Sequence, residues 1–178
     1  MDLQLAISRL SGCYVTLPTL FQGDDLEDLN LSGMRRHVRY LLENGLNADN
    51  AVLLAGGAAG EFTTMTFEER VRVIETVVDA TEGKIAVVMG AQTTSTRELV
   101  KLARAAENAG AAFIQVSPPY YFAHSDEDLY EFFLAAAESA EIGLVVYNTH
   151  WFTANVSLSL IEKLDQIPNV IGLKWSAP

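Results

Sequence analysis

Residues 85–117 have the sequence IAVVMGAQTTSTRELVKLARAAENAGAAFIQVS, and this stretch decides the fold. It begins and ends with short apolar runs that are rich in β-branched residues, 85–89 and 112–117. Between them, Ser95-Thr96-Arg97-Glu98 matches a capping box, in which the hydroxyl accepts from the N3 amide and the Glu side chain reaches back to the cap. Gly110 follows a helical pattern and suits the left-handed position after a helix. The stretch therefore predicts a strand, a helix and a second strand parallel to the first.

The same alternation extends along the rest of the chain. From the second apolar run onward, strand-like runs recur about every 30 residues, which is the length of a strand–helix unit. They are apolar throughout, as is typical of parallel strands that are covered on both faces. Further capping boxes, at 66–69 and more weakly at 125–128, mark the starts of helices. The predicted strands are 13–17, 51–55, 85–89, 112–117, 143–147 and 170–175.

Six strands that alternate with five helices fit two architectures, an open doubly wound sheet and a (β/α)8 barrel. An open sheet that binds phosphate usually carries G-x-G-x-x-G after its first strand. Residues 16–21, TLPTLF, lack this motif, and the even spacing favours the barrel. A barrel needs eight strands and about 250 residues, whereas the chain has 178. We therefore predict one α/β domain, residues 1–178, that supplies about six strands of an incomplete (β/α)8 TIM barrel.

The incomplete barrel carries an expectation about the natural protein. We expect it to continue past Pro178 by about 100 residues and to close the barrel with two more strand–helix units. A sheet that stopped after six strands would leave long, apolar edges on its first and last strands, and such edges pair with other chains and aggregate. Lys174 would then also lie on an edge strand that is open to water.

Charge and composition narrow the class of partner. The chain has 12 Lys and Arg against 23 Asp and Glu, a formal net charge of −11. This charge repels nucleic acid and anionic membrane surfaces.

No stretch approaches the roughly 18 apolar residues of a membrane span, and the N-terminus lacks the pattern of a signal peptide. Cys13 is the one cysteine, which fits a reducing compartment. We therefore predict a cytoplasmic protein with a small-molecule partner, and neither nucleic acid nor membrane as partner.

Lys174 is the strongest candidate for a catalytic residue in the sequence. In a parallel α/β protein, functional groups gather where the strands end, and Lys174 lies within the last apolar run, 170–175. Burial lowers the pKa of an amine, and a partly neutral amine is a nucleophile that can form a Schiff base with a carbonyl. The alternative is a lysine at a strand end whose ammonium reaches solvent. Spacing alone leaves both interpretations open.

Other strand ends carry weaker signals. Residues 56–60 are all Gly or Ala, so their amides can approach a ligand and form an anion nest, or can simply make a tight turn. Tyr147 can relay a proton or orient a carboxylate, or can be a buried tyrosine satisfied by a neighbour. The adjacent pair Tyr120 and Tyr121 is typical of an interface. His124 and His150 have no ligand partners at metal-like spacing, so we predict no metal site.

Together these residues resemble the dihydrodipicolinate synthase/N-acetylneuraminate lyase family of class I (Schiff-base) aldolases. The resemblance runs from about Gly12 to Lys174, nearly the whole chain. It implies a (β/α)8 barrel, usually tetrameric, that binds pyruvate or another 2-oxo acid. We expect no cofactor, because the protonated imine is itself the electron sink. The landmarks are Thr19 with Phe21, residues 57–61, residues 119–121, Tyr147-Asn148 and Gly172-Leu173-Lys174.

The resemblance also implies roles. Lys174 is then the Schiff-base lysine, and Tyr147 passes protons and steadies the bound oxo acid. Tyr121 resembles the tyrosine that a neighbouring subunit inserts into the site, which implies a homo-oligomer, a dimer or a tetramer. The substrate-binding positions are Thr19, Gly57, Ala58 and Ala59, of which the amides of Ala58 and Ala59 hold the substrate carboxylate.

Three departures from the family pattern bear on the activity. Ala58 and Ala59 stand where the family usually has one or two threonines, so a hydroxyl grip on the carboxylate is missing. Residues 149–152, THWF, replace a loop in which the synthases carry an Arg for the second substrate's carboxylate, and Trp175 stands where Glu or Asp is frequent.

We therefore expect a Schiff-base lyase, either an aldolase or a dehydratase, that acts on a 2-oxo acid through Lys174. The alternatives are 4-hydroxy-tetrahydrodipicolinate synthase itself and a non-catalytic 2-oxo acid binder or regulator. The presence of the lysine favours an enzyme, since a pure binder need not keep it.

Overall fold

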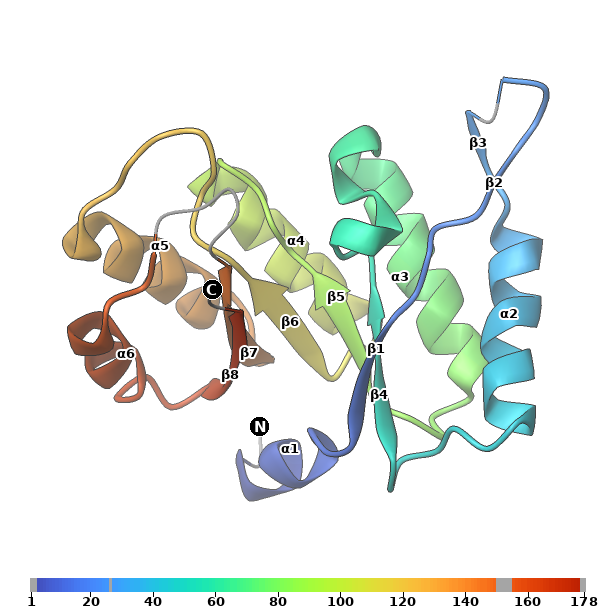
Figure 1. Cartoon of the computed structure of the whole chain (residues 1–178), viewed down its shortest axis with the longest axis horizontal. Coiled ribbons are helices and arrows are strands. Elements are labelled where there is room, and N and C mark those ends of the chain that lie inside the picture. Colours follow the sequence, from blue (N-terminus) through green and yellow to red (C-terminus); the bar gives the residue numbers. More distant parts are fainter. Residues whose placement is uncertain (1–2, 26, 150–154, 177–178) are drawn as a thin grey trace.

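The structure of the chain is a computed structural model that describes residues 3–25, 27–149 and 155–176 (Figure 1). Six parallel strands form one sheet, in which each strand lies beside the next one along the chain. All six predicted strands are present within two residues of their predicted starts and ends. They are β1 (Cys13–Thr16), β4 (Ala51–Ala55), β5 (Val87–Gly90), β6 (Phe113–Val116), β7 (Gly143–Thr149) and β8 (Val170–Ser176).

Helices between the strands cover the outer face of this curled sheet (Figure 1). They are α2 (Leu31–Glu43), α3 (Phe67–Thr81), α4 (Thr96–Asn108), α5 (Asp126–Ser139) and α6 (Leu158–Leu164), and each packs against its neighbour in the chain. Two features lie outside the predicted pattern. A short helix, α1 (Leu3–Arg9), precedes the first strand, and a small antiparallel hairpin, β2 (Phe21–Gln22) with β3 (Asp28–Leu29), follows it.

The sheet buries side chains on both faces, which explains its uniformly apolar strands. The larger core lies between the sheet and the outer helices and includes Leu53, Ile74, Leu102 and Phe133. A smaller core lies on the inner face and includes Val52, Leu54, Val88, Phe113 and Val145. Ala6 of α1 joins this inner core, so α1 covers the inner face near the end where the strands begin (Figure 1).

Side chains at the helix starts explain where the helices begin. Thr66 and Ser125 each form a complete capping box, with Glu69 and Asp128 respectively, as predicted. Ser95 forms only half of the predicted box: its hydroxyl accepts from the Glu98 amide at 3.3 Å. The Glu98 carboxylate does not complete it, because it instead accepts a hydrogen bond from Thr93 Oγ1 at 2.6 Å.

A β-bulge in β8 sets which side chains of this strand face inward. Leu144 of β7 pairs with Val170, but the next residue, Val145, pairs with Gly172, so one extra residue of β8 is accommodated at Ile171. Paired residues on adjacent parallel strands point to the same face. The bulge therefore pairs Lys174 with Tyr147, and it turns Leu173 and Trp175, 45% and 43% exposed, to the other face.

The capping box of α3 makes a testable prediction about stability. Replacing Thr66 by Ala removes the hydroxyl that accepts from the Glu69 amide, and we expect a loss of about 1 kcal/mol in the free energy of unfolding. Urea denaturation followed by circular dichroism measures the change. Thr63→Ala on the exposed turn nearby is the matched control and should stay within about 0.5 kcal/mol of the parent. Equal midpoints for the two variants would contradict the role of the box.

Candidate active site

Lys174 lies in the second half of β8, on the inner face of the sheet, and is half-buried. Its Nζ is 4.4 Å from the centroid of the Tyr147 ring and 5.0 Å from that of the Tyr14 ring. An ammonium over an aromatic face at these distances is attracted to the ring. Nζ also donates a long hydrogen bond, 3.4 Å, to Oε1 of Gln115. Three other strands, namely β1, β6 and β7, thus contribute side chains to the surroundings of this amine.

Burial lowers the pKa of the Lys174 ammonium, because the charged form loses solvation. A lower pKa means a larger neutral fraction near neutral pH, and only the neutral amine has a lone pair with which to attack a carbonyl. The surroundings of Lys174 therefore increase the fraction of its amine that is neutral. The contacts of Nζ with Gln115 and the two tyrosine rings favour this interpretation over an ammonium that extends into solvent.

Tyr121 stands apart from this cluster. Its side chain is 87% exposed, and its ring packs edge-on against Phe122, with 4.8 Å between the ring centroids. The backbone of Tyr121 has φ of 88°, a left-handed conformation that is uncommon for a residue other than glycine. The structure therefore holds Tyr147 beside Lys174 and presents Tyr121 outward on the loop after β6.

The Gly- and Ala-rich stretch after β4 forms a closed turn. Residues Ala58–Gly60 make a short 3-10 helix, η1, in which the amides of Gly60 and Glu61 donate to the carbonyls of Gly57 and Ala58. Ala58 and Ala59 are exposed, and theirs are the first amides of the turn, which have no partner within the helix itself. These are the two amides that were predicted to hold a carboxylate.

Thr19 is attached to this turn. Its buried hydroxyl donates to the carbonyl of Gly60 at 2.6 Å and so ties the loop after β1 to the turn after β4. A hydroxyl has one hydrogen to donate. In this structure that hydrogen is given to Gly60, so Thr19 holds the turn, and its role in binding substrate stays a prediction.

A second set of contacts supports the same turn from behind. A Cβ at Gly90, the last residue of β5, would lie 2.2 Å from the Gly56 carbonyl oxygen, so only glycine allows this close approach. Arg70 of α3, 4% exposed, donates through Nη2 to the Gly90 carbonyl at 2.8 Å. Its guanidinium also lies over the ring of Phe62 in η2 (Phe62–Thr64), 5.5 Å from the centroid.

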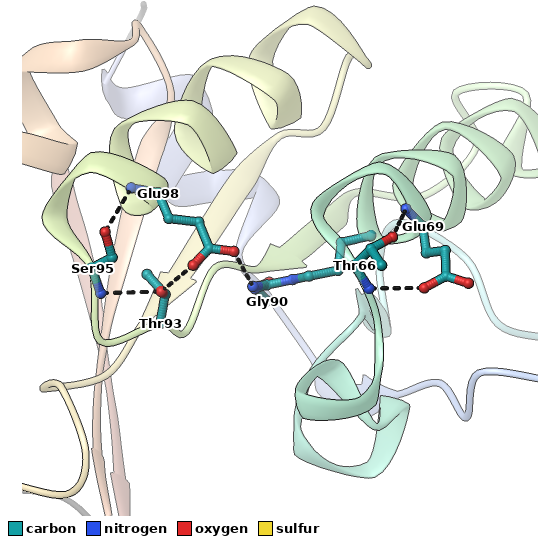
Figure 2. A network of polar contacts seen from close by, with 7 residues as sticks. Thr66, Glu69, Gly90, Thr93, Ser95 and Glu98 are labelled. Atoms are coloured by element: carbon teal, nitrogen blue, oxygen red, sulfur yellow. Dashed lines mark hydrogen bonds and ion pairs between the residues drawn. The ribbon is translucent and has the colours of Figure 1, made fainter.

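The buried Arg70 is balanced by a carboxylate at the start of the next helix. Nη1 lies 3.8 Å from Glu98 Oε1, and the same carboxylate accepts from Thr93 (Figure 2). Burial lowers the pKa of Arg70, and the Glu98 carboxylate opposes that shift. The chain of contacts from Glu98 through Arg70 to Gly90 therefore joins the starts of α3 and α4 to the turn beside the site.

Sequence reasoning missed three residues of this arrangement, namely Tyr14, Gln115 and Arg70. Tyr14 and Gln115 each lie inside a predicted apolar strand, the same signal that singled out Lys174. Arg70 gave no signal, because a charged residue in the first turn of a helix is usually solvated. Within residues 3–25, 27–149 and 155–176, no cluster of three or more His, Cys, Asp or Glu side chains could hold a metal ion. Of the two histidines considered, His124 is half-buried, and His150 lies outside the described residues.

None of the helices in the described part of the chain combines the length and the apolar character needed to cross a membrane.

Comparisons with known proteins place the chain among relatives. A family model, the dihydrodipicolinate synthetase family, matches residues 9–177. The 4-hydroxy-tetrahydrodipicolinate synthase of Methanothermobacter thermautotrophicus is 34% identical over 171 residues, which are 96% of this chain and 58% of the relative. The corresponding synthase of Pseudomonas aeruginosa is 35% identical over 166 residues, 93% of this chain and 55% of the relative. The chain thus spans about half the length of the curated relatives it matches.

Solved structures agree. The dihydrodipicolinate synthase from Acinetobacter baumannii, complexed with pyruvate, has a TM-score of 0.85 and 30% identity, with 93% of this chain and 55% of that chain covered. The N-acetylneuraminate lyase from Mycoplasma synoviae has a TM-score of 0.84, with 96% and 56% covered, and its 24% identity supports the fold alone. The predicted fold class, an incomplete (β/α)8 barrel, is confirmed.

The buried arginine makes a testable prediction. Replacing Arg70 by Met leaves the Gly90 carbonyl without its donor, so we expect a loss of about 1–3 kcal/mol in the free energy of unfolding, measured by urea denaturation. Arg72→Met, on the exposed side of the same helix, is the control and should change it by less than about 0.5 kcal/mol. Arg70→Lys should recover only part of the loss, because an ammonium lacks the fork that reaches both Gly90 and Glu98. Similar losses for Met at positions 70 and 72 would refute the network.

Proposed function

Because this chain belongs to the dihydrodipicolinate synthetase family, we propose that it acts as a Schiff-base-forming lyase on pyruvate or another 2-oxo acid through Lys174. One observation carries the proposal: a half-buried amine with a lowered pKa lies beside Tyr147 at the carboxyl end of a parallel strand. The carboxyl ends of barrel strands are where active sites of this architecture lie. The pyruvate complex of the Acinetobacter relative supports the class of substrate.

The reaction begins with attack of neutral Lys174 Nζ on the ketone carbon of the oxo acid. Loss of water gives a protonated imine, which draws electrons from the neighbouring carbon. Loss of a proton from that carbon gives an enamine, and the enamine attacks an aldehyde; the reverse sequence cleaves the carbon–carbon bond. In a dehydratase, the enamine would instead expel a hydroxyl group. The rate of the first step rises with pH until the amine is neutral, and the lowered pKa of Lys174 moves this rise toward neutral pH.

Tyr147 and the turn after β4 have complementary tasks in this proposal. The Tyr147 ring lies against Nζ, which supports a role for its hydroxyl in passing protons near the imine. The amides of the exposed residues Ala58 and Ala59, at the start of η1, would hold the substrate carboxylate. Gly57 is buried, and a Cβ there would lie 2.7 Å from Leu54 Cδ2, so this glycine supports the carboxylate site by letting the turn pack against β4. A held carboxylate presents the ketone carbon to the amine, and this positioning accelerates the attack.

We further propose a homo-oligomer, a dimer or a tetramer, in which Tyr121 reaches the site of a neighbouring subunit. The exposed aromatic pair of Tyr121 and Phe122 supports this, because exposed aromatics of this kind are enriched at protein interfaces. A cytoplasmic location fits the single, exposed Cys13, which stays a free thiol most readily in a reducing compartment.

The main alternative is 4-hydroxy-tetrahydrodipicolinate synthase itself, favoured by the names of the relatives at 34–36% identity. Against it stand the alanines at 58 and 59 and a loop, residues 149–152, without arginine, most of which lies outside the described residues. A carboxylate without an arginine partner loses a charge-assisted contact of roughly 1.5–3 kcal/mol. Turnover of aspartate semialdehyde at the rate of a dedicated synthase would favour this alternative. A non-catalytic binder would differ from both by forming no imine.

Borohydride trapping tests the lysine. Incubation with pyruvate or a panel of other 2-oxo acids, followed by borohydride, should add to the protein the mass of one oxo acid less one oxygen atom, and peptide mapping should place it on Lys174. Lys174→Met should abolish the adduct, whereas Lys163→Met on exposed α6 should not. An unchanged mass with the whole panel, or an adduct on a different lysine, would show that the assignment is wrong.

The carboxylate grip is tested at the turn. Ala59→Thr adds a hydroxyl next to the amides of Ala58 and Ala59, and we expect about fivefold tighter half-saturation by pyruvate in the trapping assay, since a hydrogen bond contributes about 1 kcal/mol. Ala123→Thr, on an exposed loop, is the control for the added bulk. If Ala59→Thr leaves half-saturation unchanged, the backbone amides hold the carboxylate without a hydroxyl.

A further inference from the structure

Gln115 is a buried polar residue in the middle of an apolar strand. It is 1% exposed, and its neighbours in β6 are Phe113, Ile114 and Val116, each exposed by no more than 1%. Burying an amide side chain is costly unless its polar atoms are hydrogen-bonded. The Oε1 atom has such a partner, Nζ of Lys174, at 3.4 Å. Because an ammonium can only donate, the end of the Gln115 amide that faces Lys174 must be the oxygen and not the NH2 group.

The contact depends on the lengths of both side chains. Gln115 pairs with Val145 of β7, whereas Lys174 pairs with Tyr147, two residues farther along the same strand. The two side chains therefore meet diagonally across the inner face of β7, from strands that are about 9–10 Å apart. A side chain one methylene shorter than Gln would not span this gap.

Two tyrosine rings complete the surroundings. Tyr14 and Tyr147 lie within 5.0 Å and 4.4 Å of Nζ, measured to the ring centroids, and they are the titratable groups that face it from β1 and β7. The Tyr14 hydroxyl is buried without a hydrogen-bond partner among the described residues, and burial raises its pKa, so it remains a neutral phenol. Both rings attract an ammonium by their faces, but the strongest acceptor toward Nζ is the amide oxygen of Gln115.

We propose that Gln115 is a positioning residue for Lys174: its amide oxygen accepts a hydrogen bond from Nζ and, with the rings of Tyr14 and Tyr147, fixes the amine on the inner face and favours its protonated form. Gln115 thus opposes the effect of burial. An amine that donates one N–H to Oε1 keeps its lone pair for a carbonyl once it is neutral. The catalytic meaning of this role rests on the proposed function, but the contact itself does not.

The test measures how readily Lys174 loses its proton. Trace acetic anhydride labels each neutral amine in competition with a standard, and peptide mass spectrometry at a series of pH values gives the titration midpoint of Lys174. Gln115→Glu places a carboxylate at the same reach and should raise the midpoint by about one pH unit or more. Gln115→Met removes the acceptor and should lower it by roughly half a unit to one unit, which makes Lys174 about three- to tenfold more reactive below the midpoint.

Two further variants separate the hydrogen bond from general effects. Gln115→Asn keeps the amide but shortens its reach, so it should shift the midpoint in the same direction as Met. Gln166→Glu adds the same charge as Gln115→Glu at an exposed position before β8 and should shift it by less than about 0.2 pH unit, because solvent screens it. Opposite shifts for Glu and Met at position 115, in folded proteins, support the proposal. Unchanged midpoints, or shifts of the same sign, overturn it.

A measurement without substitutions guards against variants that fail to fold. In the unsubstituted protein labelled with 15N-lysine and 15N-glutamine, a nuclear Overhauser contact should join the Lys174 ammonium to the Gln115 side chain. Its absence, when the contact between Lys174 and the Tyr147 ring is observed, overturns the proposal. Neither readout uses an oxo acid. Failure of borohydride trapping with a normal Gln115 effect would therefore reject the proposed function alone.

Discussion

Burial of both faces of one parallel sheet is the constraint on which the rest of the structure depends. The outer face is covered by α2 to α6, and the inner face by its own side chains and α1, so the strands are apolar along most of their length. Polar side chains are the exception on the inner face, where Tyr14, Gln115 and Tyr147 surround the amine of Lys174. Their clustering follows from the curl of the sheet, which brings its two edge strands, β1 and β8, toward the same interior and so places Tyr14 near Lys174.

The turn after β4 shows how neighbouring elements hold in place a segment whose Gly and Ala residues have no long side chains. Residues 56–60 contain only Gly and Ala, so they supply amides but no anchoring side chains of their own. The anchoring comes from elsewhere: Thr19 holds the Gly60 carbonyl, and Gly90, held by Arg70, packs against Gly56. A turn of glycine and alanine that is held this way keeps a defined backbone conformation, because its neighbours supply the contacts.

The sequence predicted the six strands, the helices between them and the position of Lys174, because hydrophobic periodicity and capping residues are local signals. It did not predict α1 or the hairpin of β2 and β3, which are too short to leave a periodic pattern. The second half of the Ser95 box was wrong, since the Glu98 carboxylate has competing partners, Thr93 five residues before it and Arg70 on another helix. The contacts of Gln115 and Tyr14 with Lys174 could not be predicted, because they depend on the order of the strands and on the curl of the sheet. The roles assigned to Tyr121, Ala58 and Ala59 by family resemblance stay predictions.

The bulge at Ile171 has a consequence for how activity can be lost or gained among proteins of this fold. Side chains along a strand alternate with a period of two, so a single-residue insertion or deletion ahead of Lys174 would reverse its phase relative to Tyr147. Leu173 would then face the interior, and the amine would face outward, while the residue composition of the strand barely changed. A lysine at the matching position in an aligned sequence is therefore insufficient to identify a working nucleophile. What decides is whether the number of residues between the bulge and the lysine is odd or even, because this number sets the face to which the lysine points.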